Sequence, residues 1–303
     1  MNRVLCSLLM AASLILSPLF ATAAPVLYGV DYSTNKLFTI DITDASVSVV
    51  GVMTAANGPT GIAFNSVGGS MYLKDLSGLY SLNPSNGAVA LVGNSAPSLG
   101  LTFNATFTSL YAIAFPNARD LIRIDPSTGG TTNLGSSGLT ARGTIEALAT
   151  NSSGQVFGAE DAGALVTYDL TTGAGSVLFN DVSGGLGLNA IAFDQNDVLY
   201  GISVTSDELL RIDVATGAST VIGSIPFVNV NGLAFAEGPF VFPAPSMPPA
   251  GGTAPEPTSL VLVLLALCML GAAERSRRSR PARTSRPHQL WHRAMHDPLA
   301  QIA

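Results

Sequence analysis

The long central region of this chain contains neither cysteine nor histidine. Cys6 and Cys268 lie in apolar segments near the two ends, and all three histidines follow residue 287. Without histidine, residues 24–254 cannot form a Ser-His-acid triad, a Cys-His pair or a histidine-ligated metal site. Without cysteine, they cannot form a disulfide or a thiolate-ligated zinc site. Any chemistry in this region would have to rest on carboxylates, hydroxyls, amides and a few basic groups.

Basic residues are also scarce there. Residues 24–254 hold 17 Asp and Glu against 6 Lys and Arg, a net charge of −11, whereas seven arginines follow Ala273. Nucleic acids are bound through clustered Lys and Arg, so we exclude them as partners of this acidic region. With 47% hydrophobic and 11% charged residues in a chain of 303, there is enough apolar content to bury a large core.

The first 23 residues have the three parts of a secretory signal peptide. A basic residue, Arg3, precedes an apolar run from Val4 to Leu16, and the small residues Ala21-Thr22-Ala23 follow. Small residues spaced in this way form the recognition site of signal peptidase. We therefore predict export and cleavage after Ala23. Retention of this segment as an uncleaved anchor is the alternative.

The C-terminal region predicts a linker followed by a membrane helix. Residues 240–253, FVFPAPSMPPAGGT, are rich in Pro and Gly and are typical of an extended linker. The apolar run 259–273 would extend about 22 Å as a helix, against about 30 Å of hydrocarbon in a bilayer. Such a transmembrane helix needs help from flanking residues, and the arginines that follow it would stay in the cytoplasm.

Residues 254–280 resemble the PEP-CTERM sorting signal of Gram-negative bacteria that produce extracellular polysaccharide. The resemblance rests on Pro255-Glu256-Pro257, then the hydrophobic run, then a basic cluster that includes Arg275, Arg277 and Arg278. It implies transient anchoring in the inner membrane, cleavage by an exosortase, and release to the cell surface or the extracellular matrix. Signal peptidase and exosortase are therefore the expected processing partners.

Residues 281–303 form a basic tail that we expect to be disordered. His288, His292 and His296 recur every four residues and would share one face of a helix, where imidazoles can bind one metal ion. However, Pro287 and Pro298 bracket only a short segment, and cleavage of the sorting signal would remove it. We therefore predict no metal site in the tail.

Between these ends, residues 24–239 contain copies of one repeat unit. Short apolar runs separated by Gly, Asn and Asp predict antiparallel strands, and the clearest copy is Asn189 to Gly223. The registers of the copies advance by 39 to 47 residues, which is typical of the blades of a β-propeller. Polar residues at the end of each third run are interpreted as turn formers. The copies align on Phe64, Phe103, Thr150, Phe193 and Phe235, on Tyr28, Tyr72, Tyr111, Phe157 and Tyr200, and on Asp41, Asn83, Asp125, Asp169 and Asp213.

The two ends of the array predict how the propeller closes. Val26-Leu27-Tyr28 is a second strand with no first strand before it, and Val230 to Phe235 is a first strand with nothing after it. Together they complete one blade and leave no unpaired edge at the junction. We thus predict an all-β fold, a five-bladed propeller of four-stranded blades closed by its C-terminal strand. It resembles secreted propeller-repeat proteins of the lactonase-like and NHL-like groups, which commonly have six or seven blades.

A candidate ligand site lies where the inner strands begin, at the mouth of the central channel. Four residues before the aligned Phe, the blades carry Thr60, Leu99, Glu146, Asn189 and Asn231, and Arg142 lies in a nearby loop. Oxygen-bearing side chains here could bind sugar hydroxyls or Ca²⁺, although we predict no obligatory cofactor. Alternatively, they satisfy backbone groups at the strand starts. The candidate ligand residues are Thr60, Glu146, Asn189, Asn231 and Arg142.

Most other charges fall in loops between second and third strands, at the same end. Charged loop residues are ordinarily solvated, and we expect that here. The acidic turn Asp194-Gln195-Asn196-Asp197 is interpreted as an Asx turn rather than a Ca²⁺ loop. The loop charges are Asp31, Lys36, Lys74, Asp75, Arg119, Asp120, Glu160, Asp161, Asp207 and Glu208.

Together these features favour an exported, non-catalytic propeller that binds a polysaccharide or a surface protein through its loop face. The rival hypothesis is an extracellular hydrolase or lyase that acts on glycans and uses Glu146 with Asp120 or Glu160, because glycoside hydrolysis needs paired carboxylates. A purely structural component of the matrix is the third hypothesis.

Overall fold

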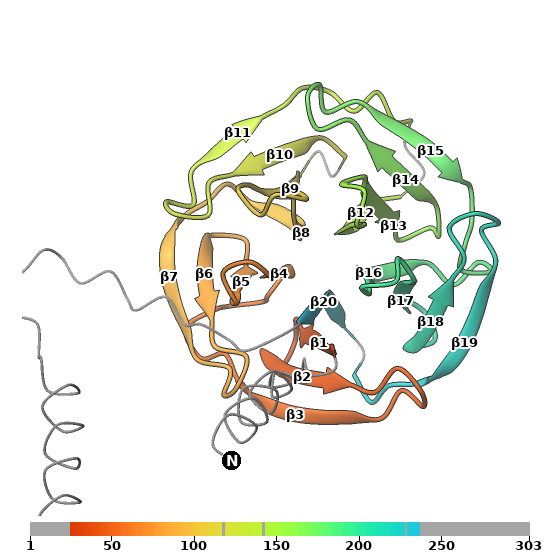
Figure 1. Ribbon diagram of the computed structural model, residues 1–303, viewed down its shortest axis with the longest axis horizontal. Helices are drawn as coiled ribbons and strands as arrows, with labels where there is room; N and C mark the ends of the chain where they lie inside the picture. Colours follow the sequence, from red (N-terminus) through yellow and green to blue (C-terminus); the bar gives the residue numbers. More distant parts are fainter. Residues whose placement is uncertain (1–24, 117–118, 141–142, 228, 237–303) are drawn as a thin grey trace, which may run out of the picture. The chain divides into compact units, whose positions relative to one another are not determined.

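Five antiparallel sheets stand around a central axis in the computed structural model (Figure 1). The structure describes residues 25–116, 119–140, 143–227 and 229–236. The predicted signal peptide, linker, sorting signal and tail lie outside the described residues. Within the described ranges, no helix is long and apolar enough to cross a bilayer.

Each sheet has four strands, with the first innermost and the fourth outermost (Figure 1). Blade 1 contains β20 (Val230–Ala236), β1 (Val26–Asp31), β2 (Lys36–Ile40) and β3 (Val47–Val52). Blade 2 contains β4 (Gly61–Asn65), β5 (Ser70–Lys74), β6 (Gly78–Leu82) and β7 (Val89–Asn94). Blade 3 contains β8 (Ser98–Phe103), β9 (Leu110–Ala114), β10 (Leu121–Ile124) and β11 (Thr131–Asn133). Blade 4 contains β12 (Ile145–Thr150), β13 (Val156–Glu160), β14 (Leu165–Tyr168) and β15 (Gly175–Phe179). Blade 5 contains β16 (Leu188–Phe193), β17 (Leu199–Ser203), β18 (Glu208–Ile212) and β19 (Ser219–Ser224).

The chain closes the propeller as predicted. β20 pairs antiparallel with β1, from Val26 opposite Ala236 to Asp31 opposite Val230. The last strand of the described chain therefore supplies the inner strand of the first blade. The five-bladed, four-stranded architecture is confirmed.

The turns between third and fourth strands confirm their predicted chemistry. The carboxylate of Asp125 accepts a hydrogen bond from the Ser127 amide at 2.8 Å, and that of Asp213 accepts one from the Ala215 amide at the same distance. Gly129 closes the first of these turns with φ near 74°, a conformation that side chains disfavour. The carboxylates of these acids stabilise the hairpins by accepting hydrogen bonds from turn amides. The same hydrogen bonds lower the pKa of Asp125 and of Asp213.

Apolar clusters fill the spaces between neighbouring blades. At the blade 4–5 interface, Ala159 and Leu165 of blade 4 pack with Leu188 and Ile191 of blade 5. Aromatic pairs repeat along the same interfaces, each joining the second strand of one blade to the inner strand of the next. Their ring centroids lie 5.6 Å apart for Tyr72–Phe103, 5.1 Å for Phe157–Phe193 and 5.5 Å for Tyr200–Phe235. The core is thus a ring of equivalent interfaces.

The outer edges of the blades are also joined in sequence. Gly93 in the outer strand of blade 2 touches the Thr128 carbonyl in the third-to-fourth-strand turn of blade 3, so closely that a Cβ there would overlap the oxygen. Each outer strand is therefore fitted against the turn of the next blade. The equivalent pairs are Gly51 with Asn86, Gly135 with Thr172, Phe179 with Gly217 and, closing the circle, Gly223 with Asp44.

Candidate functional site

The inner strands β4, β8, β12, β16 and β20 surround the centre of the propeller (Figure 1). Because each second strand runs antiparallel to its inner strand, the loops from second to third strands lie where the inner strands begin. The hairpins from first to second strands lie where the inner strands end. We call these two ends of the channel the N-terminal end and the C-terminal end.

Three predicted ligand residues are the extra residues of β-bulges at the N-terminal end. Glu146 in β12, Asn189 in β16 and Asn231 in β20 are skipped by the pairing, although both neighbours of each are paired. A bulge redirects the side chain of the extra residue. All three residues are partly exposed. None of their side chains has a hydrogen-bond partner within the described part of the chain. Their binding of a ligand stays a prediction.

Two other positions of the predicted ring are occupied differently. Thr60 is 1% exposed, and its hydroxyl donates to the Lys74 carbonyl at 3.3 Å, so it satisfies a backbone group as the alternative interpretation held. Leu99 is buried in the apolar cluster that contains Tyr111. Arg142 lies outside the described residues. The ring therefore leaves three polar side chains without a hydrogen-bond partner among the described residues, one each from blades 4, 5 and 1.

Glu146 is the one acid among these bulge residues. Partial burial raises its pKa, and the negative charge of Asp161 raises it further. Asp161 is itself held by the Thr144 amide, which donates to its carboxylate at 2.9 Å. A carboxyl group with a raised pKa in a channel can act as an acid. Catalysis by the rival mechanism would also require a second, free carboxylate.

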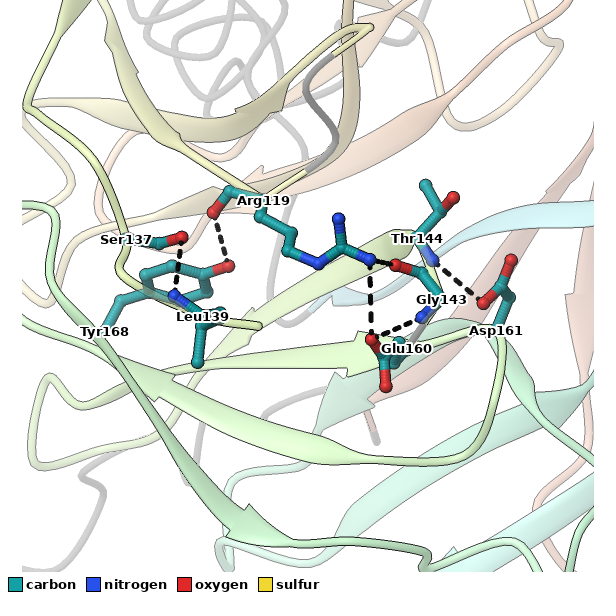
Figure 2. Close-up of polar contacts among 8 residues, drawn as sticks. All are labelled: Arg119, Ser137, Leu139, Gly143, Thr144, Glu160, Asp161 and Tyr168. Carbon is teal, nitrogen blue, oxygen red and sulfur yellow. Dashed lines mark hydrogen bonds and ion pairs between the residues drawn. The ribbon is translucent and has the colours of Figure 1, made fainter. Parts of the chain in front are cut away.

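Glu160, one of the two named candidates for that role, is engaged in a polar network with Arg119 (Figure 2). The two side chains lie 3.9 Å apart and join blade 4 to blade 3. Glu160 accepts from the Gly143 amide at 2.7 Å, and Arg119 donates to the Gly143 carbonyl. Tyr168 donates to the Arg119 carbonyl at 2.8 Å, and burial raises the pKa of Tyr168. Glu160 thus fixes the loop that enters blade 4.

Several loop charges are buried, so the expectation that they are solvated is wrong for them. Asp31, Lys74, Asp75 and Glu160 are each no more than 4% exposed. The Asp75 carboxylate accepts from two amides of its own loop, at 2.8 and 2.7 Å. The Asp31 carboxylate likewise accepts from a loop amide at 2.7 Å. Loops this tight leave backbone donors without carbonyl partners, and buried acids replace the missing acceptors.

The described ranges contain no group of side chains that could hold a metal ion. No three His, Cys, Asp or Glu side chains lie together there as a metal site would require. The Asx turn at Asp194 is confirmed, since its carboxylate accepts from the Asn196 and Val198 amides at 2.9 and 2.8 Å. Ca²⁺ binding at the N-terminal end stays a prediction that would use Glu146 with the amide oxygens of Asn189 and Asn231.

A cavity of about 310 Å³ opens at the C-terminal end instead. Its volume is at the lower end of the range of roughly 300–1,000 Å³ found for small-molecule sites. All five blades contribute to its lining, and Asp194 is the one charged residue among the described lining residues. The aromatic lining residues are Phe64, Phe103, Phe107, Phe193 and Phe235, and the polar residues at the hairpins are Ser66, Asn104, Asn151, Ser152, Asp194 and Gln195.

Blade 4 breaks the aromatic lining of this cavity. It carries Thr150 where the other blades carry an aligned Phe. The Thr150 hydroxyl donates to the Phe103 carbonyl at 2.6 Å and lies 2.9 Å from the Thr102 hydroxyl, so it is directed to blade 3. The side chain of Thr150 is much smaller than the benzyl group that the other blades carry at this position. The repeat alignment itself contains this signal, although it does not reveal that the ring of Phe residues lines a cavity.

Comparisons with known proteins concern the propeller region. Residues 99–238 match the profile of a family described as a repeat of unknown function. The chain is similar to a solved nidogen/laminin complex (13% identity, TM-score 0.48, 70% of this chain and 84% of that chain). It is similar to a protein of unknown function from Bacteroides caccae, with 13% identity and a TM-score of 0.47 over 70% of this chain and 98% of that chain. It is also similar to virginiamycin B lyase from Staphylococcus aureus, with 14% identity and a TM-score of 0.42 over 67% of this chain and 70% of that chain. No curated protein matches the chain. The propeller assignment therefore rests on the strand pairing described above.

Proposed function

We propose that this protein is an exported, non-catalytic propeller that binds a polysaccharide in the cavity at the C-terminal end of its channel. The observation that carries the proposal is the cavity itself, which combines an aromatic lining with polar hairpin residues and a single carboxylate. Ligand sites commonly combine an apolar lining with a few polar groups that fix orientation.

A sugar ring fits this combination of groups. The axial C–H bonds of a pyranose form apolar faces that pack on aromatic side chains such as Phe193 and Phe235. Its hydroxyls can exchange hydrogen bonds with amide and carboxylate groups such as Gln195 and Asp194, both of which line the cavity. The volume of about 310 Å³ suits one sugar unit rather than a long buried segment.

The same lining supports binding without hydrolysis. Glycoside hydrolysis uses two carboxyl groups on opposite sides of the scissile bond. Among the described residues of the cavity, Asp194 supplies the one carboxylate, and it is engaged in its Asx turn. Glu146 lies at the other end of the inner strands.

The cavity can be filled by restoring the residue that the repeat specifies. We expect Thr150→Phe to reduce glycan affinity at least about tenfold, because a lost contact worth about 1.4 kcal/mol lowers affinity by that factor. Thr150→Val is the matched control: it removes the hydroxyl, leaves the space open and should keep binding. A glycan array followed by calorimetry on the best ligand measures all three proteins, with hydrolysis assays on the same glycans.

Two results would contradict this assignment. Unchanged binding by Thr150→Phe would show that the ligand does not enter the cavity. Loss of binding or of turnover in Glu146→Gln would move the site to the N-terminal end and favour the rival mechanism.

The export half of the proposal rests on the two terminal signals. We expect mass spectrometry of the mature protein from its host to find Ala24 at the N-terminus and a C-terminus near Pro257. Cleavage at both sites would remove Met1–Ala23 and the basic tail. A mature protein that keeps its arginine cluster would contradict exosortase processing and leave the chain anchored in the membrane.

A further inference from the structure

Three buried polar residues lie at the N-terminal end of the blade 2–3 interface. Lys74 ends β5, Ser98 begins β8, and Ser95 lies in the connection between β7 and β8. Lys74 and Ser98 are 0% exposed and Ser95 is 9% exposed. We call these residues the polar triad. None belongs to the cavity at the C-terminal end.

The same three repeat positions are apolar at other interfaces. At the blade 5–1 interface they are Ile202, Ile225 and Val230, which belong to one apolar cluster. At the blade 4–5 interface they are Ala159, Val182 and Leu188, which also share a cluster. Repeat symmetry therefore brings the polar triad together in the position of an aliphatic core. All three positions are polar in this interface, whereas they are apolar in the two interfaces named above.

The pairing of β5 with β6 directs Lys74 into that interface. Lys74 is opposite Leu79, and residues directly opposite in a sheet point to the same face. Leu79 lies in the apolar cluster between blades 2 and 3, together with Phe103 and Leu110 of blade 3. The side chain of Lys74 therefore leaves the sheet on the face that packs in this cluster.

The triad has more hydrogen-bonding capacity than the protein uses. The hydroxyl oxygens of Ser95 and Ser98 are buried and have no partner among the described residues. The Lys74 ammonium donates one of its three hydrogens to the Asp75 carbonyl, so two of its hydrogens have no acceptor among the described residues. The neighbouring Asp75 carboxylate accepts from the Ser77 and Gly78 amides. Unused polar groups in a buried site cost stability unless something pairs with them.

Lys74 is the one titratable member of the triad. Burial lowers the pKa of Lys74 to about 8, and the negative charge of Asp75 opposes this shift. Within the described residues, the one ion pair is that of Arg119 with Glu160, so Lys74 has no carboxylate in direct contact. Buried charges are normally paired with a counter-ion or a ligand.

We propose that Lys74, Ser95 and Ser98 form a buried binding site for a small monovalent anion of the size of chloride. An ammonium and two hydroxyls can all direct hydrogens at one anion, which would use the groups that the protein leaves unpaired. The burial of the triad excludes larger anions and any substrate that would need to reach a serine nucleophile. The inference goes beyond the proposed function and does not depend on it.

The experiment measures the melting temperature of the full chain against halide concentration. Sodium chloride or sodium bromide replaces sodium gluconate at constant ionic strength, because gluconate is too large for the site. We expect a saturable rise of about 3 °C at ten times the dissociation constant of the halide. Lys74→Ile, which restores the residue of blade 5, should fold and lose this response. Lys36→Gln, at a partly exposed lysine of the same loop face, should keep it.

Each outcome decides the proposal. A response that persists in Lys74→Ile identifies a general salt effect and overturns the site, as does the absence of any response in the wild-type chain. If Lys74→Ile does not fold, the double variant Ser95→Val/Ser98→Val replaces it, with loss of the response again expected. Crystals grown in bromide should show an anomalous peak beside Lys74. A peak only at the surface would count against the site.

Discussion

Deleting residues 230–236 is expected to abolish cooperative thermal unfolding of the propeller. These residues form β20, which pairs along β1 and fills the inner position of blade 1. Val230 and Leu233 also pack against blade 5, while Ala234 and Ala236 pack in the cluster that joins blades 1 and 2. Each large buried side chain contributes about 1.5–3 kcal/mol, and the deletion would also leave an unpaired edge at the centre. We therefore expect a broad, non-cooperative melt measured by circular dichroism.

A permuted chain provides the control for this deletion. Val26 is directly opposite Ala236, so a short turn can join them and let β20 precede β1 in one continuous chain. The permuted protein should regain the cooperative transition of the wild type. A sharp, unshifted transition after the simple deletion would show that the ring does not depend on its closing strand.

Gly93→Ala is expected to lower the free energy of unfolding by about 3 kcal/mol, or the melting temperature by roughly 6–12 °C. Gly93 does not need a positive φ, so the cost comes from the new Cβ alone. That Cβ would overlap the Thr128 carbonyl, which is backbone and cannot move aside as a side chain could. The outer strand of blade 2 would have to separate from the turn of blade 3.

Gly68→Ala is the matched control for this substitution. Its nearest neighbours are atoms of the Asn65 side chain at 3.4 Å or more, in an exposed hairpin. Replacement there should change the melting temperature by no more than about 2 °C, since alanine is tolerated where glycine is not required. Equal melting temperatures for the two variants would mean that the contacts between outer strands and turns do not stabilise the ring.

The sequence was sufficient to predict the fold because the fold is repetitive. Each blade repeats the same apolar runs, and a turn that begins at Asp or Asn follows the third strand, so a strand that is ambiguous in one copy can be assigned from the others. The split blade was predictable as well, since Val26 and Val230 begin the two halves that the repeat count leaves over. The β-bulges at Glu146, Asn189 and Asn231 could not be predicted, because an inserted residue is visible only when the partner strand is known.

Burial of charge was the least predictable feature. Lys74 and Asp75 are adjacent in the sequence, and two neighbouring charges are typical of a solvent-exposed loop, yet both residues are buried. The reason is that the loop folds over its own carboxylate, while Lys74 extends the strand into an interface. The unusual nature of Lys74 is detectable in the alignment, where the other blades carry Val30, Ile113, Ala159 and Ile202 two residues after the aromatic.

The pairing of the first and last described strands also places both ends of the described chain at the same end of the channel. Val26 and Ala236 lie opposite each other where β20 ends, which is the end of the channel that carries the cavity. The described chain therefore starts and finishes on the cavity side, and the bulge carboxyl of Glu146 lies on the far side. The loops that hold Lys74 and Arg119 lie at the other end of the channel, so a partner bound there would not meet the first or the last described residue.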